Sequence, residues 1–162
     1  MESSEISIVP ATSKDADGIR EVAGTTGVFA KTDMDVVEEL LEEYEEEGEG
    51  SGYLFRVAKR EGKVVGFACY GPTPLTQGTY DLYWIAATQT VHGKGVGTAL
   101  LLSIEAEIIA AGGRLLMIET ESTPGYAAAR KLYERHGWHL DARIDDFYAP
   151  GSDRLIYSKH YK

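Results

Sequence analysis

The stretch WIAATQTVHGKGVGTALL, residues 84–101, carries the pattern that decides the fold of this chain. An apolar segment leads through a polar turn into a loop with glycine at positions 93, 95 and 97, and an apolar helix follows. Glycine has no Cβ, so such a loop can adopt positive φ angles and bring its N–H groups close to a ligand. A helix N-terminus adds unpaired N–H groups and a dipole that favours phosphate. Residues 92–98 are therefore predicted to hold a pyrophosphate group.

Two common phosphate-binding motifs do not fit the spacing of this loop. A P-loop requires Ser or Thr directly after its lysine, but Gly95 follows Lys94. A dinucleotide-binding loop requires a third glycine where this chain has Thr98. The pattern [Gln/Arg]-x-x-Gly-x-[Gly/Ala] fits better, with His92 in its first place and Gly97 in its last. The loop thus resembles the acetyl-CoA loop of the GNAT superfamily of N-acetyltransferases, and a glycine-rich turn without a ligand is the alternative.

The composition predicts a single globular domain over residues 1–162. No apolar run approaches the ~20 residues of a membrane span, and the first residues lack the pattern of a signal peptide. The single cysteine, Cys69, cannot form an internal disulfide, so a cytoplasmic protein is expected. The formal charge of −10 opposes binding to nucleic acid or to an anionic membrane and slightly favours cationic acceptors. Much of this charge lies in residues 33–49, where a solvated helix face is the simpler interpretation.

Hydrophobic periodicity and turn residues predict an α/β chain whose elements follow the order βααβββαβαββ. Helices are predicted to begin near positions 12, 32, 98 and 123. Strands are predicted over residues 6–9, 53–59, 63–70, 79–87, 114–120, 138–144 and 154–160. The segment 145–151, between the last two strands, is expected to form a loop. A chain with this order folds as a mixed sheet covered by helices.

A second segment, ARKLYERHGW at residues 129–138, is similar to the GNAT pattern A-x-x-x-Y-x-x-x-G-[Phe/Trp/Tyr]. One predicted helix and one predicted strand separate it from the glycine loop, and the whole order of elements matches the GNAT fold. The resemblance implies a mixed sheet of about seven strands with four helices. It also implies an N-acetyltransferase that moves the acetyl group of acetyl-CoA to a primary amine of a small molecule, amino acid or peptide. In that reaction the amine attacks directly through a tetrahedral intermediate, and CoA is the product.

The resemblance places acetyl-CoA beside the strand that precedes the glycine loop, with its pantetheine arm on the strand and its pyrophosphate on the loop. The implied cofactor-binding residues are Ile85, Ala86, Ala87, His92, Gly93, Lys94, Gly95, Val96, Gly97, Thr98 and Tyr126. His92 departs from the usual Gln or Arg, and a neutral imidazole lacks the fixed charge of arginine. Tyr126 stands where many relatives carry Asn. Weaker or pH-sensitive binding of the cofactor is therefore expected.

Acetyl transfer to an amine needs a base and an acid. An alkyl amine with a pKa near ~10 is mostly protonated at neutral pH, so another group must accept its proton. Asp81 lies where histone-acetylating relatives carry this base, and Glu119 or a water relay are the alternatives. The departing thiolate belongs to a thiol with a pKa near ~8.5, so a phenol with a pKa near ~10 can donate a proton to it. Tyr133 matches the general acid of the family, and a core aromatic, which its helical spacing also fits, is the alternative.

The amine acceptor is expected to bind where the first helices and the last hairpin approach the strand gap. The candidate walls are Phe29, Tyr83, Phe147 and Tyr148. The sequence does not identify the acceptor, because one fold serves many substrates. A homodimer is compatible with the resemblance, and no metal is expected at the site. Since His92 and Tyr126 depart from the family pattern, a non-catalytic module that binds acetyl-CoA or CoA is the alternative function. A nucleotide-binding enzyme of another fold is the third hypothesis.

Overall fold

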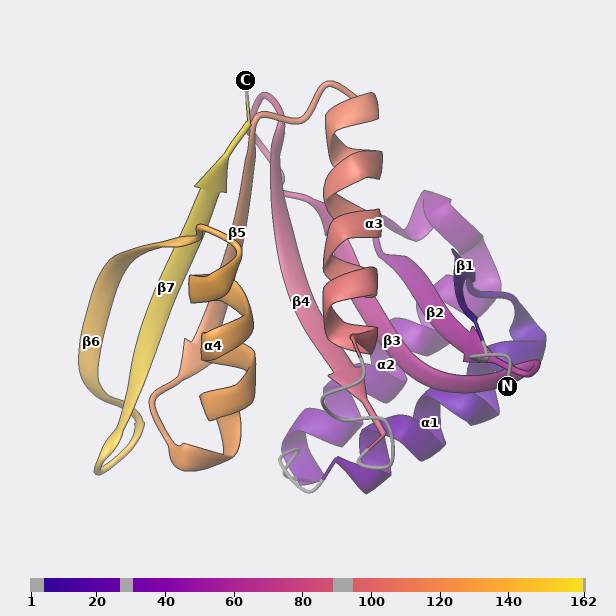
Figure 1. Ribbon diagram of the computed structural model, residues 1–162, viewed down its shortest axis with the longest axis horizontal. Coiled ribbons are helices and arrows are strands. Elements are labelled where there is room, and N and C mark those ends of the chain that lie inside the picture. The colour runs from indigo at the N-terminus through magenta and orange to yellow at the C-terminus, as the bar shows by residue number, and fades with distance from the viewer. Residues whose placement is uncertain (1–4, 27–30, 89–94, 162) are drawn as a thin grey trace.

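The computed structural model describes residues 5–26, 31–88 and 95–161, which are organised around one mixed sheet (Figure 1). The strands are β1 (Ile6–Pro10), β2 (Leu54–Arg60), β3 (Lys63–Pro72), β4 (Thr79–Ala87), β5 (Leu115–Glu121), β6 (His139–Ala149) and β7 (Ser152–His160). They lie in the order β1-β2-β3-β4-β5-β7-β6. β4 and β5 are parallel, and the other neighbouring pairs are antiparallel.

The helices cover both faces of this sheet. They are α1 (Ala16–Thr25), α2 (Lys31–Glu47), α3 (Val96–Ala110) and α4 (Ala127–Arg135), with short 3-10 turns η1 (Ser13–Asp15), η2 (Gly48–Ser51) and η4 (Pro124–Tyr126). α1 and α2 lie on one face, and α3 and α4 lie on the other (Figure 1). The predicted order βααβββαβαββ is confirmed. Among the described residues, no helix combines the length and the apolar composition that a membrane span requires.

The alternation of side chains along β3 gives each face of the sheet its own apolar core. Phe67 and Cys69 belong to the cluster beneath α1 and α2, whereas Ala68 and Tyr70 belong to the cluster beneath α3. Successive side chains of a strand point to opposite faces, so a strand buried on both sides needs apolar residues at every position. Burial of one side chain such as Phe67, which is fully inaccessible, contributes about 1.5–3 kcal/mol to stability.

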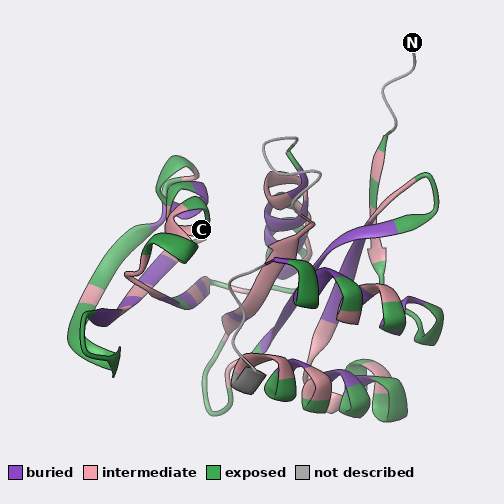
Figure 2. Cartoon of the chain, turned by 90° about the horizontal axis from the view of Figure 1, so that it is seen from below, coloured by how far each residue is buried: buried purple, intermediate pink, exposed green. Residues whose placement is uncertain are grey.

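The last hairpin is longer than predicted, and the expectation of a loop over residues 145–151 is wrong. β6 continues to Ala149 and β7 begins at Ser152, so only Pro150 and Gly151 connect them. Residues 145–148 depart from regular pairing with β7, which explains why their sequence resembles a loop. β6 is the edge of the sheet, and all but one of its residues are exposed (Figure 2).

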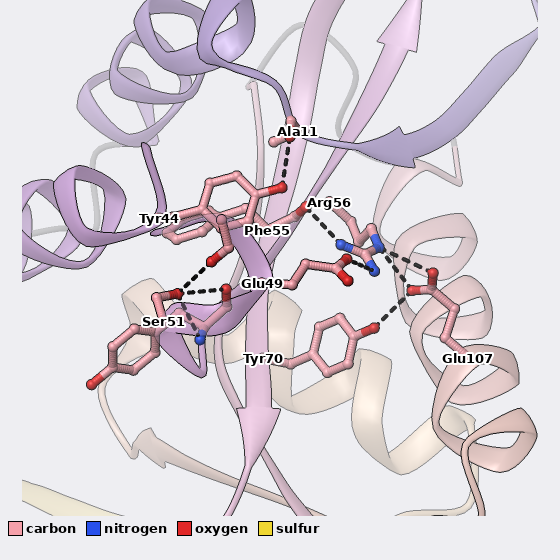
Figure 3. A network of polar contacts seen from close by, with 10 residues as sticks. Ala11, Tyr44, Glu49, Ser51, Phe55, Arg56, Tyr70 and Glu107 are labelled. Carbon is pink, nitrogen blue, oxygen red and sulfur yellow. Dashed lines mark hydrogen bonds and ion pairs between the residues drawn. The ribbon is translucent and has the colours of Figure 1, made fainter. Parts of the chain in front are cut away.

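A buried arginine joins β2 to α3 and to the turn after α2 (Figure 3). Arg56 donates through Nε to both carboxylate oxygens of Glu107, at 2.9 and 3.1 Å, and through one terminal nitrogen to Glu49 at 3.0 Å. Its other terminal nitrogen donates to the Phe55 carbonyl at 3.1 Å, and the Tyr70 hydroxyl donates to Glu107 at 2.8 Å. This network satisfies a charged group that would otherwise be costly to bury.

A second buried charge, on Asp15, fixes the start of the first helical segment. Its carboxylate accepts the Thr12 backbone N–H at 2.9 Å and pairs with the Lys59 ammonium at 2.8 Å. Burial raises the pKa of Asp15, but the bonds from Lys59 and Thr12 outweigh it, so the pKa lies below the ordinary value of 3.8. A lowered folded-state pKa means that this carboxylate stabilises the fold above the ordinary value and ceases to do so as the pH falls through the lowered value.

Replacing Asp15 with asparagine is therefore expected to lower the free energy of unfolding by about 1–3 kcal/mol near neutral pH. The difference from wild type should shrink as the pH falls below 3.8, because Asp15 is protonated first in the unfolded chain and then, at its lowered pKa, in the folded protein. Urea unfolding near neutral pH and near pH ~3 would measure both values. The matched control is Asp17→Asn, because the Asp17 side chain is fully exposed and should contribute little. An Asp15 variant no less stable than this control would contradict the prediction.

Candidate active site

The site begins where the parallel pair of strands separates. β4 and β5 pair only at Thr79 with Leu115, at Tyr80 with Leu116 and at Asp81 with Met117. Beyond Asp81, β4 continues along β3 while β5 continues along β7, and the two strands diverge (Figure 1). Divergence removes the ladder partner from the facing edge of β4, so its backbone groups at 82–86 can pair with a bound molecule.

A pocket of about 220 Å³ opens at this divergence. Its lining residues are Asp81, Leu82 and Tyr83 of β4 and Met117, Ile118 and Glu119 of β5. The structure therefore brings three of the predicted residues together: the two candidate bases, Asp81 and Glu119, and the candidate acceptor wall Tyr83. A carboxylate on each strand of a narrow gap is an arrangement suited to proton transfer from a bound amine.

The N-terminus of α3 lies beside the end of β4. Gly95 has φ of 82°, a left-handed conformation that favours glycine, and it is the N-cap of α3. The first i to i−4 bond of the helix runs from the Ala99 N–H to the Gly95 carbonyl at 2.9 Å. The N–H groups of Val96, Gly97 and Thr98 precede this bond and can therefore bind a ligand. Close packing fixes this turn, because a Cβ on Gly66 of β3 would lie 2.8 Å from Val96 Cγ1.

These features fit the pyrophosphate of acetyl-CoA at the described part of the predicted loop. Gly95, Val96, Gly97 and Thr98 form a glycine-bearing turn whose amides precede the first helical bond. The Thr98 hydroxyl lies 3.4 Å from His136 Nε2 of the segment after α4. The predicted contacts His92, Gly93 and Lys94 lie outside the described residues, as does the predicted acceptor wall Phe29. Ile85, Ala86 and Ala87 lie on β4 beside the divergence, as predicted.

Tyr133, the predicted acid, lies in α4 and is only 1% exposed. Its ring packs against the rings of Trp138, at 5.3 Å, and Tyr157, at 5.8 Å between centroids. Burial raises the pKa of Tyr133 well above its ordinary value, so the phenol stays protonated near neutral pH. The Tyr133 ring is therefore part of the hydrophobic core, whereas the role of its hydroxyl as a proton donor stays a prediction.

Both candidate bases already accept hydrogen bonds. The Thr73 hydroxyl donates to Asp81 Oδ2 at 2.6 Å. Glu119 forms an ion pair with Arg154 of β7. Each of these contacts uses one of the two carboxylate oxygens, so it orients the group without occupying it fully. The choice between Asp81, Glu119 and a water relay stays open.

Aromatic side chains of the last hairpin lie near Arg154, the partner of the pocket residue Glu119. The rings of Phe147 and Tyr148 meet edge to face, at 4.9 Å and 85°. The Arg154 guanidinium lies 4.7 Å from the centre of the Phe147 ring while it pairs with Glu119. Burial raises the pKa of Tyr148, and the charge of Glu119 raises it further. This places Tyr148 in the electrostatic neighbourhood of the pocket.

The two remaining predicted tyrosines lie on different sides of the site. Tyr83 packs edge to face on Tyr53 at 5.6 Å, and burial raises its pKa to about 12. Tyr126 belongs to the turn η4 before α4, and burial together with the charge of Glu121 raises its pKa. Sequence reasoning missed Arg154, whose only signal was a cation at the start of a predicted strand. Within the described ranges, no group of three or more His, Cys, Asp or Glu side chains could hold a metal ion.

Comparison with known protein families identifies the class of this molecule. Residues 20–138 match the family model described as the acetyltransferase (GNAT) family. The chain belongs to this family. A solved structure of a protein from Desulfovibrio desulfuricans, provisionally assigned to the GNAT acetyltransferases, superposes with a TM-score of 0.91. It is 39% identical, over 96% of this chain and 99% of that one. The predicted family, fold and enzyme class, an acyltransferase, are thus confirmed.

More distant GNAT structures share the same fold. The ribosomal-protein-S18-alanine N-acetyltransferase of Escherichia coli has a TM-score of 0.79 at 20% identity, over 96% of this chain and 94% of that one. The PaiA N-acetyltransferase of Thermoplasma acidophilum, solved in complex with coenzyme A, has a TM-score of 0.76 at 19% identity, over 97% and 99%. At such identities the likeness shows the fold alone. No curated protein sequence matches this GNAT chain.

Proposed function

We propose that this GNAT chain transfers the acetyl group of acetyl-CoA to a primary amine of a small molecule, amino acid or peptide. The observation that carries the proposal is the divergence of β4 and β5, which opens a pocket between Asp81 and Glu119. The glycine-capped N-terminus of α3 lies at the end of the same strand. We further propose that residues 1–162 act as one domain, because a single sheet takes strands from both ends of the chain.

Each part of the site has a proposed role. The backbone of Ile85–Ala87 and the amides of the loop, His92–Thr98, would hold acetyl-CoA, with Tyr126 beside them. Acetyl-CoA supplies the acetyl group as an activated thioester. Asp81 or Glu119 would accept the proton of the amine, directly or through water, and Tyr133 would donate a proton to the departing thiolate. A high pKa suits this donor because it must hold its proton until the bond to sulfur breaks.

The charges around the pocket favour a cationic acceptor. Arg154 offsets the charge of Glu119, but among the described residues no cation pairs with Asp81, which lines the pocket. Burial raises the pKa of Tyr126 and of Tyr148, and the charge of Glu121 raises both further. Carboxylates beside aromatic faces stabilise ammonium groups. Phe29 and Tyr83 would complete the acceptor walls with Tyr148.

A non-catalytic module that binds CoA is the second candidate function. The observation that favours it is the engagement of both pocket carboxylates, Asp81 with Thr73 and Glu119 with Arg154. A chain of this kind would bind acetyl-CoA and transfer its acetyl group to no amine.

Acetyl-CoA is expected to raise the melting temperature of the protein. A ligand at 100 times its Kd adds roughly 2.7 kcal/mol, which corresponds to several degrees for a domain of this size. The measurement is thermal unfolding with acetyl-CoA, and with ATP and NAD as controls. A shift with acetyl-CoA alone supports the proposal, and an amine panel assayed by thiol release then separates the enzyme from the module. The absence of any shift with acetyl-CoA would contradict both candidates.

A further inference from the structure

The hairpin of β6 and β7, which adjoins β5, contains an unusual bulge. Its register passes from Ile144 opposite Arg154 to Ala149 opposite Ser152. Four residues of β6, 145–148, therefore lie opposite one residue of β7, Asp153. Asp146 within the bulge has φ of 53°, a left-handed conformation that is uncommon for any residue but glycine. Such a bulge must be held by specific contacts, because it forfeits regular ladder bonds.

The Asp153 carboxylate supplies those contacts. It is buried, with 7% of the residue exposed. Its Oδ1 accepts the Asp146 N–H at 2.9 Å, and its Oδ2 accepts from Arg143 Nε at 2.7 Å. The Asp146 carboxylate in turn accepts the Gly151 N–H at 2.8 Å, which closes the turn. The bond from the Asp146 N–H, with a further contribution from Arg143, lowers the pKa of Asp153, so it stays charged in this role.

The backbone of Asp153 ties the same point to the end of β5. Its N–H donates to Ser122 Oγ at 2.8 Å, and its carbonyl accepts the Ser122 N–H at 3.1 Å. The last residue of β5, Glu121, accepts a hydrogen bond from the Ser152 hydroxyl at 2.9 Å. One residue thus links the bulge of β6 to the strand that forms a wall of the pocket.

The bulge carries an aromatic pair that lies near the charges of Arg154 and Glu119. Phe147 and Tyr148 are its last two residues, and Phe147 packs against the Arg154 guanidinium. Arg154 pairs with Glu119, which lines the pocket. A bulge re-aims the side chains that a regular strand would alternate between two faces. The contacts of Asp153 therefore set where these rings lie relative to Glu119.

We propose that Asp153 is a positioning residue for the amine acceptor. By fixing the bulge at Asp146, it holds Phe147 and Tyr148 against the acceptor side of the pocket. This inference rests on the proposed acetyl transfer. It assigns Asp153 no contact with the reacting atoms and none with acetyl-CoA.

The test uses two substitutions of Asp153 and one control in the full-length protein. Asp153→Ala removes both carboxylate contacts, and Asp153→Asn keeps an oxygen for the Asp146 N–H but loses the ion pair with Arg143. The control is Asp141→Asn, which alters a carboxylate of the same hairpin that accepts from the Ser158 hydroxyl at the opposite end of β6. Should the alanine variant fail to fold, the asparagine variant carries the test.

Kinetics with the best amine of the panel give the first measurement. We expect KM for the amine to rise about tenfold in Asp153→Ala and less in Asp153→Asn, with kcat and KM for acetyl-CoA nearly unchanged. A substitution that only destabilised the fold would not raise KM for the amine while leaving kcat and KM for acetyl-CoA unchanged. Equal losses in every constant, or the same rise in the Asp141 control, would overturn the positioning role.

Hydrogen exchange gives a second measurement that needs no activity. Amides in peptides covering 145–149 should exchange faster in both Asp153 variants than in wild type and in the control. Unchanged exchange there would contradict the positioning role by itself. A wild-type chain that acetylates no amine in the panel would instead contradict the proposed function, so the two failures are distinguishable.

Discussion

Replacing Tyr133 with phenylalanine is expected to lower kcat for acetyl transfer by about 10²-fold or more, since positioned general acids contribute on that scale. The change removes one hydroxyl and keeps the ring that packs between Trp138 and Tyr157. Because burial raises the pKa of Tyr133, the wild-type donor should remain protonated at neutral pH. The wild-type enzyme should lose activity through deprotonation of Tyr133 only above pH ~10. The variant should therefore lack that alkaline limb.

The measurement is kcat over a range of pH, together with the melting-temperature shift caused by acetyl-CoA. A retained shift would show that the variant folds and still binds acetyl-CoA. Tyr157→Phe is the matched control, because Tyr157 is also buried in the same cluster and its hydroxyl donates to Glu134 at 3.2 Å. We expect kcat of this control to stay within about threefold of wild type. Equal kcat values for the Tyr133 variant and the control would leave Tyr133 as a core aromatic only.

Replacing Arg56 with methionine is expected to lower the free energy of unfolding by about 3 kcal/mol, the low end of the range for breaking a buried ion pair. The low end applies because the Arg56 side chain is 7% exposed while its partner Glu107 is 38% exposed. Methionine retains much of the apolar stem but removes the guanidinium that donates to Glu107 and to the Phe55 carbonyl (Figure 3). Glu107 then keeps the Tyr70 hydroxyl as a donor, and the Phe55 carbonyl keeps the Ala11 N–H. The contacts between β2 and α3 should weaken accordingly.

Urea unfolding of the Arg56→Met variant provides the measurement, read as a lower midpoint at unchanged m-value. Arg20→Met is the matched control. Arg20 contacts Asp17, Glu38 and Glu45, but its side chain is 33% exposed, so its loss should cost at most about 1 kcal/mol. Similar losses for the two variants would show that burial of the Arg56 network adds nothing to stability.

The order of elements was predictable because each signal is local. β3 could be recognised from its apolar run, and α3 from the glycine loop that precedes it. The last hairpin was predicted too short because residues 145–151 contain Asp, Pro and Gly, which are typical of loops. The structure shows that β6 continues through 145–149, where Ala149 pairs with Ser152 and Asp153 holds the bulge. Those contacts join residues whose partnership no turn rule specifies.

The residues of the candidate site were likewise only partly predictable from the sequence. The motif around Gly95 predicted a ligand loop from spacing alone, and the helix motif singled out Tyr133. The partner of Glu119 could not be predicted, because Arg154 lies 35 positions away in the chain. An ion pair of this separation depends on the neighbouring positions of β5 and β7 in the sheet, which are decided by the whole topology.

The sequence by itself determined the family, the succession of helices and strands, and the glycine turn at the start of α3, since periodicity and backbone freedom act over a few residues. Only the tertiary structure decided that β4 and β5 separate after Asp81, that Asp81 and Glu119 share one pocket, and that a buried carboxylate on β7 holds the bulge of β6. The reason is that strand register and burial are properties of the whole sheet. They bring together side chains whose individual sequence environments carry no sign of one another.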